Sequence, residues 1–179
     1  MARLPYPDAS QLSDKAREAL ASVPPLNIFR MIAHAETAVR PWLRFGGAIL
    51  TRLQLDPQLR ELAILQVAHQ AEAEYEWVQH VAIARHVGVT DAQIDAIRNN
   101  ATDIDPALDD QQRAVLAFTI ELIDHPRVSD PTFAAVNRWL TPREIVELML
   151  TIGQYLMLAR VMTTLELELD DPAGGRLVE

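Results

Sequence analysis

The clearest pattern of apolar positions in the chain predicts a helix from Pro57 to about Gln70. Asp56 and Pro57 are typical of an N-cap followed by a first-turn proline. Apolar residues then recur at the spacing of one helical face, at Leu59, Leu62, Ala63, Leu65, Val67 and Ala68. A second helix is predicted from about Glu74 to His86, because Gly88 then provides a C-terminal stop signal. The two helices should form a hairpin.

Similar start and stop signals predict further helices on both sides of this hairpin. The segments before it are residues 10–22, a short stretch after Asn27, and a helix from Pro41 toward Leu53. Those after it are residues 91–98, 110–124, 130–140 and a long helix from 142 through 159 toward 167. Residues 103–110 form an acidic loop. We therefore predict an all-α bundle of about seven to nine helices.

Composition supports one helical domain. The chain has 179 residues, of which 49% are hydrophobic, which is enough for one sizeable core. Its 11 prolines and only 6 glycines fit helices that are separated by proline-marked turns. We expect a single domain over residues 1–179.

The charge balance and the absence of cysteine exclude several kinds of function. With 25 acidic and 16 basic residues, the net charge of -9 makes nucleic acid and anionic membranes unlikely partners. Zero cysteines exclude a disulfide framework, a thiolate metal site and a thiol nucleophile. The N-terminus has no apolar signal segment, and no uninterrupted apolar run approaches the roughly 18 residues of a spanning helix. We expect a cytoplasmic protein.

The densest group of polar residues lies on the predicted hairpin. Glu76 and His80 are four residues apart and therefore share one helical face. Across the hairpin, Glu61 and His80 should be offset by about one turn, within reach of each other if both face the seam. A carboxylate beside an imidazole is a general acid/base pair. The same spacing also fits a surface pair that stabilises the helix by only a few tenths of a kcal/mol.

Three sequence strings resemble the carboxymuconolactone decarboxylase and alkylhydroperoxidase D family. Residues 60–69 read RELAILQVAH, 74–80 read EYEWVQH, and 84–88 read ARHVG. Residues 152–160, IGQYLMLAR, are similar to the last helix of longer members. The resemblance covers about residues 40–170, so we interpret 1–39 as an N-terminal helical extension and 171–179 as a flexible tail.

The resemblance implies which residues form the site. In the peroxidase branch a Glu, a Cys-x-x-Cys pair and a His act together, and here they correspond to Glu61, to Ala73 and Glu76, and to His80. Tyr75 lies between the two former cysteine positions. Without a thiolate, dithiol peroxidase chemistry is excluded.

The decarboxylase branch implies a lyase that needs no cysteine. His80 would deliver the proton, Glu61 would orient it, and Glu76 would complete the catalytic group. For a small carboxylated substrate, we expect binding contacts from His69, Tyr75 and Arg60. Candidate cations for a substrate carboxylate are Arg40, Arg44, Arg60, Arg85 and Arg160. The resemblance also implies a homo-oligomer, as a dimer, trimer or hexamer.

Two alternatives remain open at this stage. Glu61, His69, Glu76 and His80 could be drawn as a metal site, but Glu76 precedes His80 by four rather than the three residues of carboxylate-bridged bundles. We therefore expect no metal and no cofactor. The second alternative is a non-catalytic member that binds a small molecule or serves only in assembly. A seam closed by Trp77 or Tyr75 would favour that alternative.

Overall fold

The computed structural model describes residues 1–170, which form an all-helical single domain without strands in that range. The prediction of an all-α fold is confirmed. The prediction of a flexible tail concerns residues 171–179, which lie outside the described residues. The described helices are α1 (Asp14–Ala21), α2 (Asn27–Ile32), α3 (Glu36–Thr51), α4 (Pro57–Gln70), α5 (Glu74–His86), α6 (Asp91–Arg98), α7 (Asp110–Asp124), α8 (Asp130–Val136) and α9 (Pro142–Thr164).

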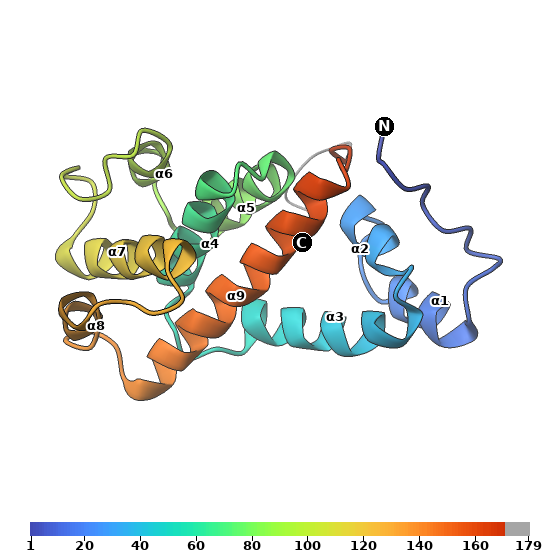
Figure 1. The fold of residues 1–179 in the computed structure, drawn as a ribbon, viewed down its shortest axis with the longest axis horizontal. Coiled ribbons are helices and arrows are strands. Elements are labelled where there is room, and N and C mark those ends of the chain that lie inside the picture. Colours follow the sequence, from blue (N-terminus) through green and yellow to red (C-terminus); the bar gives the residue numbers. More distant parts are fainter. Residues whose placement is uncertain (171–179) are drawn as a thin grey trace.

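The predicted hairpin of α4 and α5 lies at the centre of the domain. Every residue of α4 from Leu59 to Ala68 is buried, because α4 packs against α5, α6, α7 and α9. The long helix α9 crosses the molecule between the α6–α8 end and the α1–α3 end (Figure 1). The hairpin is therefore held on several sides, which fixes the side chains that lie along its seam.

Local sequence signals explain where the central helices begin. Asp56 accepts hydrogen bonds from the backbone N–H groups of Gln58 and Leu59, with Pro57 in the first turn. Thr141 and Glu144 form a capping box at the start of α9. Gly88 has a φ of 94°, which favours glycine, and it follows the end of α5.

Several predicted helix boundaries were wrong. The helix predicted from Pro41 begins at Glu36, and Pro41 lies inside it. Pro41 is the sixth residue of α3, so its missing N–H removes one backbone hydrogen bond, to the Thr37 carbonyl, in the second turn of the helix. The helix predicted from Ser10 begins only at Asp14, because Ser13 is its N-cap. Helices α8 and α9 end at Val136 and Thr164, short of the predicted ends at 140 and 167.

The N-terminal segment packs against the end of α9. The Arg3 N–H donates to the Leu165 carbonyl at 2.8 Å, and the Arg3 guanidinium pairs with Glu166 at 2.7 Å. The Asn27 N–H, at the start of α2, donates to Asp170 at 3.0 Å. The polypeptide before and within α2 is thus held over the end of the α5–α9 seam.

Helix α9 is the one helix in residues 1–170 whose length and composition would suit a membrane span. Within its most apolar window, however, 56% of the residues are buried inside the protein. That degree of burial is typical of the core helix of a folded domain.

One face of α9 remains apolar and exposed. Val146, Met149, Leu150 and Met157 are each 44–55% exposed and follow helical spacing. Contiguous apolar faces of this kind are common at protein interfaces. We propose that this face packs against a second copy of the chain, in keeping with the expected homo-oligomer.

Gel filtration tests this assembly. The wild-type protein should elute at a multiple of its 20.0 kDa chain mass, and Leu150→Glu should shift it toward the monomer, since a buried unpaired charge is costly. Ala92→Glu, on the exposed surface of α6, is the matched control. A sharp monomer peak of the wild-type protein at micromolar concentration would contradict the proposal.

Candidate acid/base site

The hairpin brings Glu61 and His80 into direct contact. Oε2 of Glu61 lies 2.8 Å from Nδ1 of His80, and the Glu61 side chain is completely buried. An ionised carboxylate only accepts hydrogen bonds, so Nδ1 of His80 carries the hydrogen. Its other nitrogen, Nε2, then has a free electron pair in the neutral ring and no partner among residues 1–170. This arrangement makes Nε2 a base.

Arg60 compensates the charge of Glu61. Its Nε donates to Oε1 of Glu61 at 2.9 Å, and a terminal nitrogen donates to the Leu50 carbonyl at 2.8 Å. Arg60 is only 5% exposed and does not line the pocket described next. The predicted contact between Arg60 and substrate is therefore not what the structure shows. Because a buried carboxylate needs a counter-charge, Arg60 instead holds Glu61 in place.

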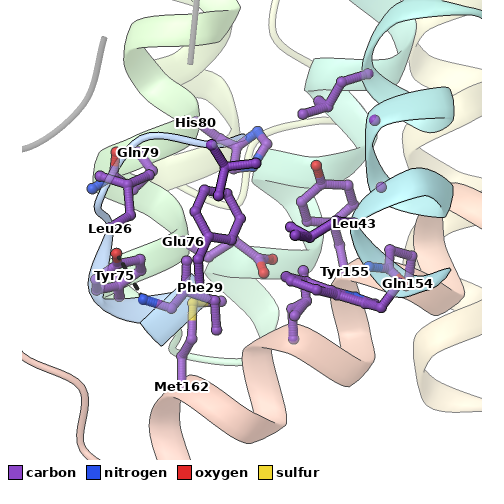
Figure 2. Close-up of a pocket in the computed structure, with 17 residues that line it drawn as sticks. Leu26, Phe29, Leu43, Tyr75, Glu76, Gln79, His80, Gln154, Tyr155 and Met162 are labelled. Atoms are coloured by element: carbon purple, nitrogen blue, oxygen red, sulfur yellow. Dashed lines mark hydrogen bonds between the residues drawn. The ribbon is translucent and has the colours of Figure 1, made fainter. Parts of the chain in front are cut away.

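His80 lies on the wall of an apolar pocket between α2, α3, α5 and α9 (Figure 2). The pocket has a volume of about 160 Å³, comparable to engineered cavities that bind benzene. It therefore suits a small, single-ring molecule. The lining is dominated by apolar side chains, among them Leu26, Ile28, Phe29, Trp42, Leu43, Leu50, Leu158 and Met162.

Glu76 is the one carboxyl group in the described lining of this pocket. It is 2% exposed, and neither of its side-chain oxygens has a hydrogen-bond partner. Burial, and secondarily the negative charge of Glu61, raise the pKa of Glu76 well above its ordinary value. Burial therefore favours the protonated form of Glu76, which can donate a proton. The hydrogen bond to His80 that helical spacing allowed is absent.

Tyr155 fixes the His80 ring from the α9 side. The two ring centroids are 4.7 Å apart in an edge-to-face arrangement. Burial, followed by the charges of Glu61 and Glu76, raises the pKa of Tyr155 well above its ordinary value. The phenol is thus neutral and does not compete with His80 as a base.

Tyr75 lines the pocket, but its hydroxyl group is already hydrogen-bonded. It donates to the carboxylate of Asp170 and accepts from the Ile28 N–H at 3.4 Å. Burial and the bond to Asp170 raise the pKa of Tyr75 well above its ordinary value. Tyr75 therefore connects the wall of the pocket to α2, and it leaves the pocket open.

His69 is not part of this site. It lies on another face of α4, where its Nε2 is 3.0 Å from Oδ1 of Asn100 and its ring packs near Trp77. The prediction that His69 contacts the substrate therefore does not hold for this pocket. Among residues 1–170 no group of three His, Cys, Asp or Glu side chains is arranged to hold a metal ion.

The predicted arginine clamp is also not observed. Among residues 1–170 no Lys or Arg lines the pocket. Arg85 pairs with Asp91 at 2.8 Å on the surface, Arg160 is exposed, and Arg40 and Arg44 lie at a separate depression beside α1.

Sequence reasoning missed three of the polar residues in the pocket. Trp42 comes from α3, and Gln154 and Tyr155 come from α9. Gln154 and Tyr155 lie in the family-like string of residues 152–160, but nothing in the sequence identifies any of the three as a pocket residue. Their common signal is only visible in three dimensions, since all three face the same cavity.

The arrangement of helices defines the class of fold. A peroxidase-related protein from Ralstonia eutropha JMP134 with an alkylhydroperoxidase AhpD core superposes with a TM-score of 0.82 at 21% identity, over 96% of this chain and 93% of that one. A second peroxidase-related protein, from Silicibacter sp. TM1040, gives a TM-score of 0.79 at 18% identity, over 93% and 91%. The debrominase Bmp8, in complex with 2,3,4-tribromopyrrole, gives 0.71 at 18% identity, over 94% and 90%. The protein therefore has the AhpD-like fold.

The family is given by sequence. Residues 36–121, which contain Glu61, Glu76 and His80, match the model of the Carboxymuconolactone decarboxylase family. The match covers 86 of the 179 residues, and the resemblance predicted from the sequence is confirmed over this range. Comparison with curated proteins gave no significant match.

Proposed function

We propose that the protein is an acid–base enzyme of the lyase or isomerase type that moves protons on a small, single-ring, largely apolar substrate. One observation carries this proposal: an imidazole and a buried carboxyl group line the same apolar pocket. His80 presents Nε2 as the base, since Nδ1 is bonded to Glu61, and Glu76 is the acid, since burial raises its pKa. Two neighbouring titratable side chains whose surroundings shift their pKa values apart are typical of acid/base catalysis.

The residues have distinct roles in this proposal. Nε2 of His80 would remove a proton from an activated carbon of the substrate, and Glu76 would deliver its own proton to another atom of the same conjugated system. A proton returning from His80 to Glu76 then restores the site, so no oxidant or reductant is needed. Glu61 is a positioning residue, because it holds the tautomer of His80 and does not line the pocket. The sequence-based assignment of His80 as the acid is thereby revised.

The pocket also narrows the substrate class. Because no Lys or Arg of residues 1–170 lines it, a substrate with several carboxylates finds no counter-charge in the described lining. A substrate with a single carboxylate, as in the decarboxylation predicted from the sequence, would have to place it beside the carboxyl group of Glu76, which offers no positive charge. The single-ring size is in keeping with the AhpD-like debrominase whose structure holds 2,3,4-tribromopyrrole.

Solvent deuterium exchange tests the proposal without knowledge of the product. The protein is incubated in D₂O with a panel of five- and six-membered cyclic ketones and unsaturated lactones, and proton NMR follows deuterium entering the carbons next to the carbonyl group. We expect exchange above the buffer rate for at least one compound, in proportion to protein concentration. Exchange at the buffer rate across the panel would contradict the proposal.

A non-catalytic binding protein is the second candidate function. The observation that favours it is the apolar pocket itself, which would hold a small ring without any chemistry. Compounds that bind in the pocket but exchange no protons would support this alternative.

A further inference from the structure

The pocket contains hydrogen-bond donors that no residue of the described chain uses. Nε1 of Trp42 and Nε2 of Gln154 are buried without a partner, and both residues line the pocket. Buried polar groups in folded proteins are nearly always paired, and leaving them unpaired costs free energy. An unused pair of donors in one cavity therefore indicates a ligand group that they bind.

The chemistry of the two donors defines that group. An indole N–H and an amide N–H both donate, so the ligand atom must be an acceptor. Neither side chain is charged, so the acceptor need not be an anion, and the apolar walls disfavour one. A carbonyl oxygen meets both conditions. Figure 2 shows the Glu76 carboxyl group pointing toward the side of the cavity where Gln154 lies.

We propose that the N–H groups of Trp42 and Gln154 bind the carbonyl oxygen of an uncharged ketone or lactone. This inference rests on the proposed function for its catalytic meaning: when His80 removes a proton beside the carbonyl, the C–H electron pair moves to form a C=C bond, and the C=O electron pair moves to the oxygen. The two donors then hold an enolate oxygen, whose negative charge strengthens both hydrogen bonds.

Gly46 leaves space beside Nε2 of Gln154. A Cβ atom built on Gly46 would lie 4.0 Å from Nε2 of Gln154, in the lining of the same pocket. A methyl group there would occupy space next to the donor, where an acceptor oxygen must sit. The glycine in α3 thus keeps one side of the Gln154 amide open.

Two probes of similar shape test the proposal. Acetophenone has a carbonyl group next to its ring, whereas ethylbenzene does not. We expect the wild-type protein to bind acetophenone about tenfold more tightly than ethylbenzene, since two hydrogen bonds of typical net strength change affinity by roughly that factor or more. Trp42→Phe and Gln154→Leu should each reduce this preference, and the double variant should remove it. Calorimetry or NMR titration measures the affinities, and the infrared C=O stretch of bound acetophenone should lie at lower frequency in the wild-type protein than in the double variant.

Two further variants keep the test independent of folding defects. Gly46→Ala should fold at least as stably, because Ala is a better helix former than Gly, yet it should lower the preference for acetophenone. Gln66→Leu is the matched control: Gln66 is a buried glutamine with an unpaired Oε1, and it lies outside the pocket lining. It should keep the preference.

The outcomes separate this inference from the proposed function. If acetophenone is preferred and its C=O stretch is shifted, but no compound of the panel exchanges protons, the carbonyl site stands and the acid–base function fails. If acetophenone and ethylbenzene bind equally, or if neither binds, the carbonyl site is wrong whatever the exchange experiment shows.

Discussion

Replacing His80 by Gln should slow the catalysed deuterium exchange by about 10²- to 10⁴-fold, the usual contribution of a positioned general base. His80 is the one imidazole in the described pocket lining, and burial raises the pKa of Glu76 and of Tyr155, which favours their protonated forms. Proton NMR of the panel compound that exchanges fastest in the wild-type protein measures the effect.

Replacing Glu61 by Gln should also slow the exchange strongly. The amide keeps the shape of the side chain but removes the charge that fixes the hydrogen on Nδ1 of His80. Since the two residues act as one unit, the variant with both changes should be little slower than His80→Gln alone.

His69→Gln is the matched control for these variants, because His69 lies on α4 outside the pocket and bonds to Asn100. It should retain the wild-type rate. Full activity in His80→Gln would mean that another group is the base. A double variant that is slower than the wild-type protein by the product of the two single effects would mean that Glu61 and His80 act separately.

The second large effect is expected in the pH dependence of stability, and it comes from Glu76. Its folded-state pKa is raised above the unfolded value by burial and by Glu61. When the pH is below the unfolded-state pKa of about 4.3, Glu76 is protonated in both the folded and the unfolded protein, so its ionisation does not lower the stability. As the pH rises above that value, the unfolded chain releases the proton while folded Glu76 retains it. The wild-type protein therefore loses stability, by about 1.4 kcal/mol per pH unit, until the pH passes the folded pKa.

Glu76→Gln removes this dependence, since an amide does not ionise. The variant should become progressively more stable than the wild-type protein from pH 5 upward, as measured by urea unfolding at several pH values. Glu74→Gln, two residues earlier on α5 and exposed, controls for the effect of the substitution itself. A stability difference between wild type and Glu76→Gln that does not change with pH would show that Glu76 is ionised in the folded protein.

Sequence reasoning was most successful where local signals determine the structure. The caps at Asp56 and Thr141 and the stop at Gly88 placed the central helices closely, and counting residues across the hairpin predicted that Glu61 and His80 would meet. The same counting explains the error at His69. It lies eight residues after Glu61, which at 3.6 residues per turn rotates it by about 80° from the seam.

The rest of the site could not be predicted in this way. Trp42 and Gln154 are more than a hundred positions apart and meet only because α3 and α9 pack beside α5. Periodicity shows that such residues are buried, but it does not show which cavity they face. The unpaired N–H groups become visible only when every buried donor has been matched to its partners.

The site draws its residues from two parts of the chain, one inside the range matched by the family model and one outside it. Glu61, Glu76 and His80 all lie within the family-matched residues 36–121. Gln154 on α9 and the residues around α2 that cover the cavity lie outside that range. Substitutions in these flanking helices could change the ligand while leaving the proton-transfer groups untouched. Proteins that share only the hairpin with this chain are thus expected to share its chemistry without sharing its substrate.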